Sequence, residues 1–429
     1  LKYSFQIECS VCLRRNVRLM FLYVSFVDSW DTFFAKSMSE GNGHQHVEMF
    51  TEKSDPHDWE TWSLQLNRGS LVSRQTLHHF AKELVYCSPP VAFRRQFWGF
   101  CIDHVDPELT FVPPIVDLIE AAIGADEVVG QHDLQLITLD VARTRNLSEE
   151  QQVVLARILK AHCSLHARRS RSSNVSADSS RGVHYQQGMH MLAACPLWAG
   201  LAEVEALALF ELVLNTLCRG CHTDPDLATF RKNASILETL IRERLPTLAA
   251  AFGVSGKPLM LLSFDPLLCL FTLHLRCSAA IRFWDVLIVE GNLVVIFALQ
   301  LALLEHFVSN PNLLGPEAAF EDQFGSTFAE KLGYLMGELD EVDVEGIVRR
   351  CRELMMQTGA HGLRQRVEQL QTKNPGVTGQ SAPFSFMGAV SGLSNMLAAA
   401  GKAFVSTVGD DGHLGRTVSE GDALGARNI

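Results

Sequence analysis

The sequence predicts an all-α fold, and three observations support this prediction. The chain has 429 residues, of which 47% are hydrophobic, so it can bury a sizeable core. From Trp59 onward, apolar residues recur at intervals of three and four, as they do on one face of a helix. Residue pairs typical of β-hairpin turns are nearly absent. Periodic segments joined by short breaks indicate helices packed on helices.

The expected helices follow one another from Trp59, with turn residues between them. The first apolar stripe runs from Trp59 to Leu84, and the later segments keep the same period and stop near residues such as Gly124. These later segments are 93–102, 114–123, 149–165, 203–217, 235–252, 279–289, 293–307, 328–336 and 342–356.

Three segments differ from this pattern, and they set the expected domain limits. Residues 1–58 form an undefined amino-terminal segment that ends in a polar linker. Residues 168–181 read RRSRSSNVSADSSR and predict a mobile loop, because they offer almost nothing to bury. Residues 373–429 predict a mobile tail rich in Gly, Ser and Ala, although the spacing of apolar residues over 386–408 also suits an amphipathic helix at a membrane surface. The expected domain therefore spans residues 59–372.

Composition excludes several classes of protein. The net charge of −11 offers no field for a polyanion, so we expect no nucleic-acid partner. Eleven scattered cysteines suit reduced thiols in a cytoplasmic protein better than a disulfide framework. The longest uncharged apolar run, 292–304, is shorter than the roughly 18–20 residues that cross a bilayer. We therefore expect a cytoplasmic protein, with peripheral contact to endomembranes through the tail as a further possibility.

No metal site is expected from the sequence. The CxxC pairs that begin at Cys9 and Cys218 lie about two hundred residues apart, far outside the spacing of a zinc ribbon. The neighbouring His78 and His79 lack companion ligands at a suitable spacing. Solvated or core histidines are therefore the default interpretation.

Two short motifs hold the candidate site. Asp140 and Arg143 lie three residues apart, so on a helix the carboxylate could hold the guanidinium in one orientation. The second motif contains Tyr185, Gln187 and Gly188, and it begins 42 residues after Arg143. A planar guanidinium can neutralise charge on a transferring phosphoryl group, and a glutamine amide can orient an attacking water. Taken alone, the Asp140/Arg143 spacing is more typical of an ordinary ion pair on a helix surface.

The pattern IxxDxxR followed by YxQ resembles the signature of the TBC domain, the catalytic module of Rab GTPase-activating proteins. In this chain the pattern consists of Ile137, Asp140, Arg143, Tyr185 and Gln187. Further landmarks of the family occur in the same order elsewhere in the chain. They are Arg94, Trp98, Trp284, Asp285 and Gly291. The resemblance extends over residues 59–371.

The resemblance implies a V-shaped, two-lobed helical TBC domain that stimulates GTP hydrolysis by a Rab-family small GTPase and so regulates vesicle trafficking. Arg143 would act as an arginine finger, and Gln187 would orient the hydrolytic water. Asp140 would fix Arg143, while Tyr185 and Gly188 would shape the turn that carries Gln187. The protein would accelerate hydrolysis by its partner rather than hydrolyse GTP itself.

The remaining landmarks are expected to hold the fold rather than touch the partner. The resemblance implies no cofactor of the chain's own, because Mg²⁺ and GTP belong to the GTP-bound partner. The chain departs from the family at His184, His190 and Pro266, which replace a glycine, an asparagine and a tryptophan, and it lacks the Gly-Ile of the family's opening turn. None of these changes removes a catalytic group, but the two histidines flank Gln187 and could alter its loop. A catalytically silent GTPase-binding scaffold and a membrane-associated interaction protein are the alternatives.

Overall fold

The computed structural model describes residues 59, 62–63, 66, 74–89, 91–104, 129–172, 185–222, 224, 227–255, 259–309, 328–359 and 362–373. The segment 1–58, the helix expected over 114–123, His184 and the tail with its 386–408 pattern lie outside these residues. Within the described ranges every regular element is helical and no strand occurs, which confirms the predicted all-α class. The V-shaped outline stays a prediction. Among the described residues, no helix combines the length and apolar character needed to cross a membrane.

The chain divides into two compact units, residues 1–104 and 105–429. The first unit contains α3 (Arg74–Leu84), a short 3₁₀ turn (Val85–Cys87) and α4 (Val91–His104). Its core is aromatic: the ring of Trp62 lies 5.9 Å from that of Phe97 in an edge-on arrangement. Trp98 is fully buried, and Arg94 donates a hydrogen bond of 3.2 Å to the carbonyl of Pro89 just before α4.

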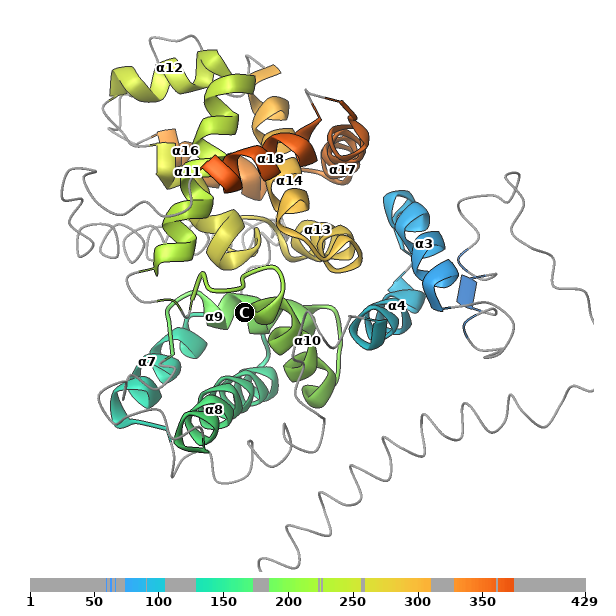
Figure 1. The fold of residues 1–429 in the computed structure, drawn as a ribbon. Helices are drawn as coiled ribbons and strands as arrows, with labels where there is room; N and C mark the ends of the chain where they lie inside the picture. Colours follow the sequence, from blue (N-terminus) through green and yellow to red (C-terminus); the bar gives the residue numbers. More distant parts are fainter. Residues whose placement is uncertain are drawn as a thin grey trace, which may run out of the picture. The chain divides into compact units, whose positions relative to one another are not determined.

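The second unit holds the remaining helices. They are α7 (Gln131–Ala142), α8 (Glu149–Ser172), α9 (Met189–Trp198), α10 (Glu203–Asn215), α11 (Ala228–Arg244), α12 (Pro246–Ser255), α13 (Cys277–Glu290), α14 (Leu293–Ser309), α16 (Phe328–Glu338), α17 (Glu341–Met356) and α18 (Leu363–Lys373). Two short segments, η4 (Leu259–Ser263) and η5 (Asp265–Cys269), lie between α12 and α13. In Figure 1, α7, α8, α9 and α10 gather side by side, and α9 packs on all three of its neighbours as well as on α13 and η5.

Helix α13 carries three of the family landmarks. Trp284 is fully buried and donates a hydrogen bond of 3.0 Å from its indole nitrogen to the carbonyl of Leu270. Asp285 is also fully buried. The helix ends at Gly291, where φ is +61° and the backbone N–H returns to the carbonyl of Leu287. A glycine at this position ends the helix without the steric penalty that a side chain would add.

Two sequence predictions about element limits are wrong. The single helix expected over 235–252 is two helices, since α11 ends at Arg244 and α12 begins at Pro246. Proline lacks the N–H that an interior helical position must donate, but it fits the first position of a new helix. Residues 168–172, expected in a loop, belong to α8, which continues to Ser172. An established helix propagates at little cost per residue, and arginine favours it.

The spacing of apolar residues in the sequence does not predict helix α9. Every residue from Met189 to Leu197 is buried, so the helix has no polar face and no amphipathic period. Its position explains this composition, because neighbouring elements surround it. The helix that follows the glutamine motif is therefore, like α7 and α18, missing from the helices that the apolar pattern predicts.

Candidate functional site

Arg143 lies at the carboxyl end of α7, where it is the C-cap residue. Helix α7 turns Ile137 and Asp140 inward, and both side chains are almost completely buried. Three residues beyond Asp140, Arg143 pairs through Nη2 with Asp140 Oδ1, while 42% of the arginine side chain stays exposed. The ion pair between Asp140 and Arg143, predicted from their spacing, is therefore present. It differs from an ordinary surface ion pair because the carboxylate of Asp140 is buried.

Asp140 is the centre of a buried hydrogen-bonded network. Its second oxygen, Oδ2, accepts a hydrogen bond of 2.5 Å from the hydroxyl of Tyr185 and lies 3.3 Å from His190 Nδ1. The Tyr185 hydroxyl also lies 3.0 Å from the same imidazole nitrogen. Residues 45 positions apart in the sequence are thus joined at one carboxylate, and the arginine motif is tied to the glutamine motif.

The charge on Asp140 is stabilised by these partners. Burial by itself would raise the pKa of the carboxyl, but the hydrogen bond and charge of His190, the Tyr185 hydroxyl and the charge of Arg143 together lower it below its usual value. Burial and the neighbouring Asp140 raise the pKa of Tyr185 well above its usual value, so the phenol keeps its proton and remains a donor. The network therefore persists as a carboxylate with three donors around it.

Gln187 lies in the turn between Tyr185 and the start of α9, and its side chain is half-buried. Gly188 follows it with φ of +106°, a conformation that side chains rarely tolerate. A Cβ at this glycine would lie 3.4 Å from Cys269 Sγ and 3.8 Å from a carbon of the His222 ring. The turn is therefore fixed from two sides, by Tyr185 at its start and by close packing at Gly188.

His222 forms part of the floor beneath this turn. Its Nε2 lies 3.0 Å from the carbonyl of Leu268, and the residue is buried. Burial lowers the pKa of His222 to about 4, with the Leu268 carbonyl opposing the shift and the charge of His162 adding to it. The imidazole is therefore neutral at physiological pH.

Arg145 anchors the chain just beyond Arg143. Its guanidinium donates to the carbonyls of Thr272, at 3.0 Å, and Leu275, while its own carbonyl accepts a hydrogen bond of 3.2 Å from Trp198. These contacts fix the end of α7 to the end of α9 and to the segment before α13. The sequence carried no sign of this role, because the guanidinium's acceptors are backbone atoms 127 and 130 residues away in the chain.

The structure brings Asp140, Arg143 and Tyr185 together and places Gln187 and Gly188 in the turn that Tyr185 starts. Arg94 and Trp98 lie in the first unit, and the landmarks of α13 lie within the helical core of the second. In the sequence, His190 stands out only as a neighbour of Gln187. Its contact with Asp140 depends on the fold, since no spacing rule predicts it.

Comparison with known proteins relates this site to a family. The model of the Rab-GTPase-TBC domain matches residues 123–310, which include both motifs. TBC1 domain family member 2A of Rattus norvegicus is 28% identical over 124 residues, which are 29% of this chain and 13% of the rat protein. Growth hormone-regulated TBC protein 1 of Homo sapiens is 27% identical over 125 residues, 29% of this chain and 37% of the human protein. The matched segment thus spans well under half of each relative.

The fold is shared with a solved structure. The crystal structure of the Chlamydomonas flagellar RabGAP TBC domain superimposes with a TM-score of 0.51 at 19% identity, over 70% of this chain and 91% of the other. At this identity the likeness concerns the fold alone. Residues 123–310 of this chain thus match the model of the Rab-GTPase-TBC domain, and the chain shares the fold of a solved RabGAP TBC domain.

Proposed function

We propose that this chain is a GTPase-activating protein that stimulates GTP hydrolysis by a Rab-family small GTPase in its GTP-bound state. The match of residues 123–310 to the model of the Rab-GTPase-TBC domain supports a Rab GTPase as partner. One observation supports the residues in particular: the buried carboxylate of Asp140 holds the half-exposed guanidinium of Arg143 and, through Tyr185, the turn that carries Gln187. Both proposed fingers thus depend on the same internal anchor.

Arg143 has the properties required of a group supplied in trans. Its ion pair with Asp140 limits the rotamers of the side chain, so less entropy is lost when a phosphate is contacted. Its 42% exposure leaves part of the guanidinium accessible to a partner. In the proposed mechanism this cation stabilises the negative charge that develops during transfer of the γ-phosphoryl group.

Gln187 would act on the water rather than on the phosphate. An amide can donate a hydrogen bond and accept one at the same time, so it can orient a water molecule for in-line attack. The positive φ of Gly188 holds the adjoining backbone in a conformation that other residues rarely adopt. Orientation requires such a fixed support, because small displacements of reacting groups slow a reaction strongly.

The proposal includes no cofactor of the chain's own, since Mg²⁺ and the nucleotide would arrive with the partner. We further propose that the protein is cytoplasmic and takes part in vesicle trafficking.

We also propose peripheral membrane contact through the tail. The apolar pattern over residues 386–408, on which this contact depends, lies outside the described residues. A flotation assay of the full chain with small vesicles, compared with a chain that ends at Lys373, tests the membrane contact.

The decisive experiment is single-turnover GTP hydrolysis by a panel of GTP-loaded Rab proteins, with and without the purified chain. We expect one or a few of them to be accelerated, and Arg143→Ala to reduce that acceleration by about 10³–10⁵-fold. Gln187→Ala should reduce it as well, without loss of Rab binding.

Arg157→Ala is the matched control. Arg157 is 50% exposed and pairs with Glu203 through two hydrogen bonds of 2.7 and 2.5 Å, so it resembles Arg143 in exposure and charge but lies away from the Asp140 network. Its replacement should leave the rate unchanged. Rab binding without any acceleration would instead support the silent scaffold, and unchanged activity in both finger variants would overturn the proposed mechanism.

A further inference from the structure

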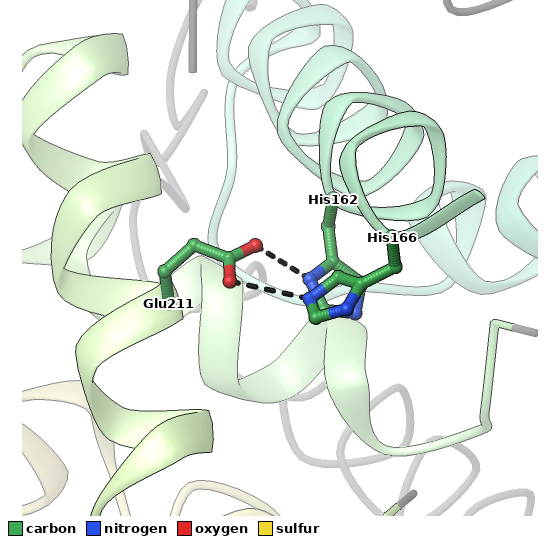
Figure 2. A group of neighbouring side chains, drawn as sticks. All are labelled: His162, His166 and Glu211. Carbon is green, nitrogen blue, oxygen red and sulfur yellow. Dashed lines mark hydrogen bonds and ion pairs between the residues drawn. The ribbon is translucent and has the colours of Figure 1, made fainter. Parts of the chain in front are cut away.

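A second buried carboxylate, that of Glu211, lies between helices α8 and α10. Figure 2 shows two imidazoles, His162 and His166, that point from α8 toward Glu211 on α10. The histidines are four residues apart and therefore lie on one face of α8. Glu211 is completely buried, His162 is 2% exposed and His166 is 18% exposed. The three side chains each offer a ligand atom, and these atoms lie within 4.8 Å of one another.

The internal hydrogen bonds of this group are incomplete. Glu211 Oε1 lies 2.6 Å from His162 Nδ1, but the nearest partner of Glu211 Oε2 is His166 Nε2 at 3.5 Å, which is long for a hydrogen bond. Within the described part of the chain, neither Glu211 Oε2 nor His162 Nε2 has a hydrogen-bond partner. Buried polar atoms in this state call for an explanation, and an unfilled ligand position supplies one for Glu211 Oε2.

A cavity of about 500 Å³ adjoins the two histidines. Its other described lining residues include Arg219, Asp224 and Thr229, so one basic and one acidic side chain face the same space. The charges of Arg219 and Asp224 are opposite in sign, and the buried Glu211 adds a negative charge next to the two histidines. The cavity offers a path for an ion and room for a water molecule as an additional ligand.

We propose that His162, His166 and Glu211 form a binding site for a divalent first-row transition metal ion, for which Zn²⁺ is the appropriate probe. Two imidazoles and one carboxylate make a ligand set that Zn²⁺ uses with water in the fourth position. Imidazole ligands disfavour Mg²⁺ and Ca²⁺, which prefer oxygen.

Each histidine faces a different oxygen of Glu211, at a separation that can be compared with that of two ligands on one metal ion. With metal–ligand bonds of about 2.0–2.1 Å, neighbouring ligands of a tetrahedral ion lie about 3.3 Å apart. The 3.5 Å between Glu211 Oε2 and His166 Nε2 already matches this separation. The 2.6 Å between Glu211 Oε1 and His162 Nδ1 is a proton-bridged distance, and it would lengthen by about 0.7 Å when the metal replaces the bridging proton.

The test uses the purified full chain, stripped of metal with EDTA and then titrated with ZnCl₂ in a calorimeter. We expect one Zn²⁺ per chain and a rise in the thermal unfolding midpoint on binding. His166→Ala should weaken binding by more than the about 10–100-fold that loss of an outer-shell partner costs. This variant is preferred to His162→Ala because His166 is the more exposed ligand and its loss is easier for the fold to tolerate.

His306→Ala is the matched control, since His306 also lies 3.5 Å from a carboxylate, that of Asp343, and is 24% exposed. It should bind Zn²⁺ as the wild type does. Replacement of Zn²⁺ by Co²⁺ identifies the ligands, because thiolate ligation adds intense near-ultraviolet absorption that nitrogen and oxygen ligands do not. Absence of binding, equal binding by His166→Ala and wild type, or a thiolate signal would each overturn the proposal. Binding that persists in Arg143→Ala separates this site from the proposed GTPase-activating function.

Discussion

Asp140 and Glu211 are two buried carboxylates in the same unit, each beside an imidazole, but their surroundings differ. Asp140 also holds Arg143, whose side chain is 42% exposed, so the network reaches the protein surface. Glu211 has only His162 and His166 as basic partners among the described residues, and this network opens on a cavity. A buried carboxylate next to an imidazole thus holds a partly exposed arginine in one case and a second histidine in the other. The two networks differ because Arg143 is 42% exposed, whereas His166 is 18% exposed.

The two networks also differ in the partners that stabilise the charge of the carboxylate. An arginine stays charged at all relevant pH values, so Asp140 always has a cationic partner. Burial would raise the pKa of Glu211, but the charge and hydrogen bond of His162, with help from His166, lower it well below its usual value. Among the described residues, the carboxylate of Glu211 therefore has two histidines as basic partners, whereas that of Asp140 has a histidine and an arginine.

The largest effect on stability should come from Glu211→Gln in the metal-free protein. The change removes the carboxylate that lies between two imidazoles, and breaking a buried pair in this way typically costs about 3–5 kcal/mol in the free energy of unfolding. Urea denaturation measures it. Glu305→Gln is the control, because that carboxylate is 20% exposed in its pair with Arg350 and should cost about 1 kcal/mol or less. Equal losses in the two variants would contradict the comparison.

The next effect concerns pH and His222. The folded pKa of about 4 lies below the unfolded value of 6.5, so the unfolded chain takes up a proton first as the pH falls. The stability contributed by the neutral histidine is complete above pH 6.5 and is lost between pH 6.5 and about 4, by up to about 3 kcal/mol. His222→Gln should remove the loss of unfolding free energy that the protonation of His222 causes in this pH range. Urea midpoints of wild type and variant, measured across that range, should converge as the pH falls.

Asp140→Asn should weaken the proposed activity in addition to the stability that it costs as a buried, paired carboxylate. Without its charge, the side chain no longer fixes Arg143, and misplacement of a reacting group can slow a reaction on the order of 10²-fold. Single-turnover GTP hydrolysis by the responsive Rab measures it. If Asp140 acts through Arg143, adding Asp140→Asn to Arg143→Ala should bring little further loss. Full additivity of the two losses would show that Asp140 acts independently.

The smallest effect should come from Gly188→Ala. The alanine would have to adopt φ of +106° with its Cβ 3.4 Å from Cys269 Sγ, which we expect to cost about 1–2 kcal/mol. Gly130→Ala is the control, because that glycine has φ of −63° and a Cβ added there would meet no atom within 4 Å. Thermal unfolding midpoints should fall for Gly188→Ala and change little for Gly130→Ala. The reverse order would refute the role assigned to the turn.

Periodicity predicted most of the amphipathic helices, because a helix with one apolar face repeats its pattern every 3.6 residues. It failed at α9, which is buried on all sides, and at Leu245, where one apolar stripe continues across the break before Pro246. The Asp140 and Arg143 pair was predictable from spacing, since both lie within one helical turn. The roles of Gln187 and the other site residues stay predictions.

The sequence by itself determined the helical class, the two motifs and the resemblance to a TBC domain, because these depend on local spacing and residue type. Only the tertiary structure decided that Asp140 is shared by Arg143, Tyr185 and His190, and that Glu211 meets two histidines from another helix. Apart from the Arg143 pair, such contacts join residues 45 or more positions apart. They follow from how helices pack, and packing is set by the sum of many buried side chains rather than by any one motif.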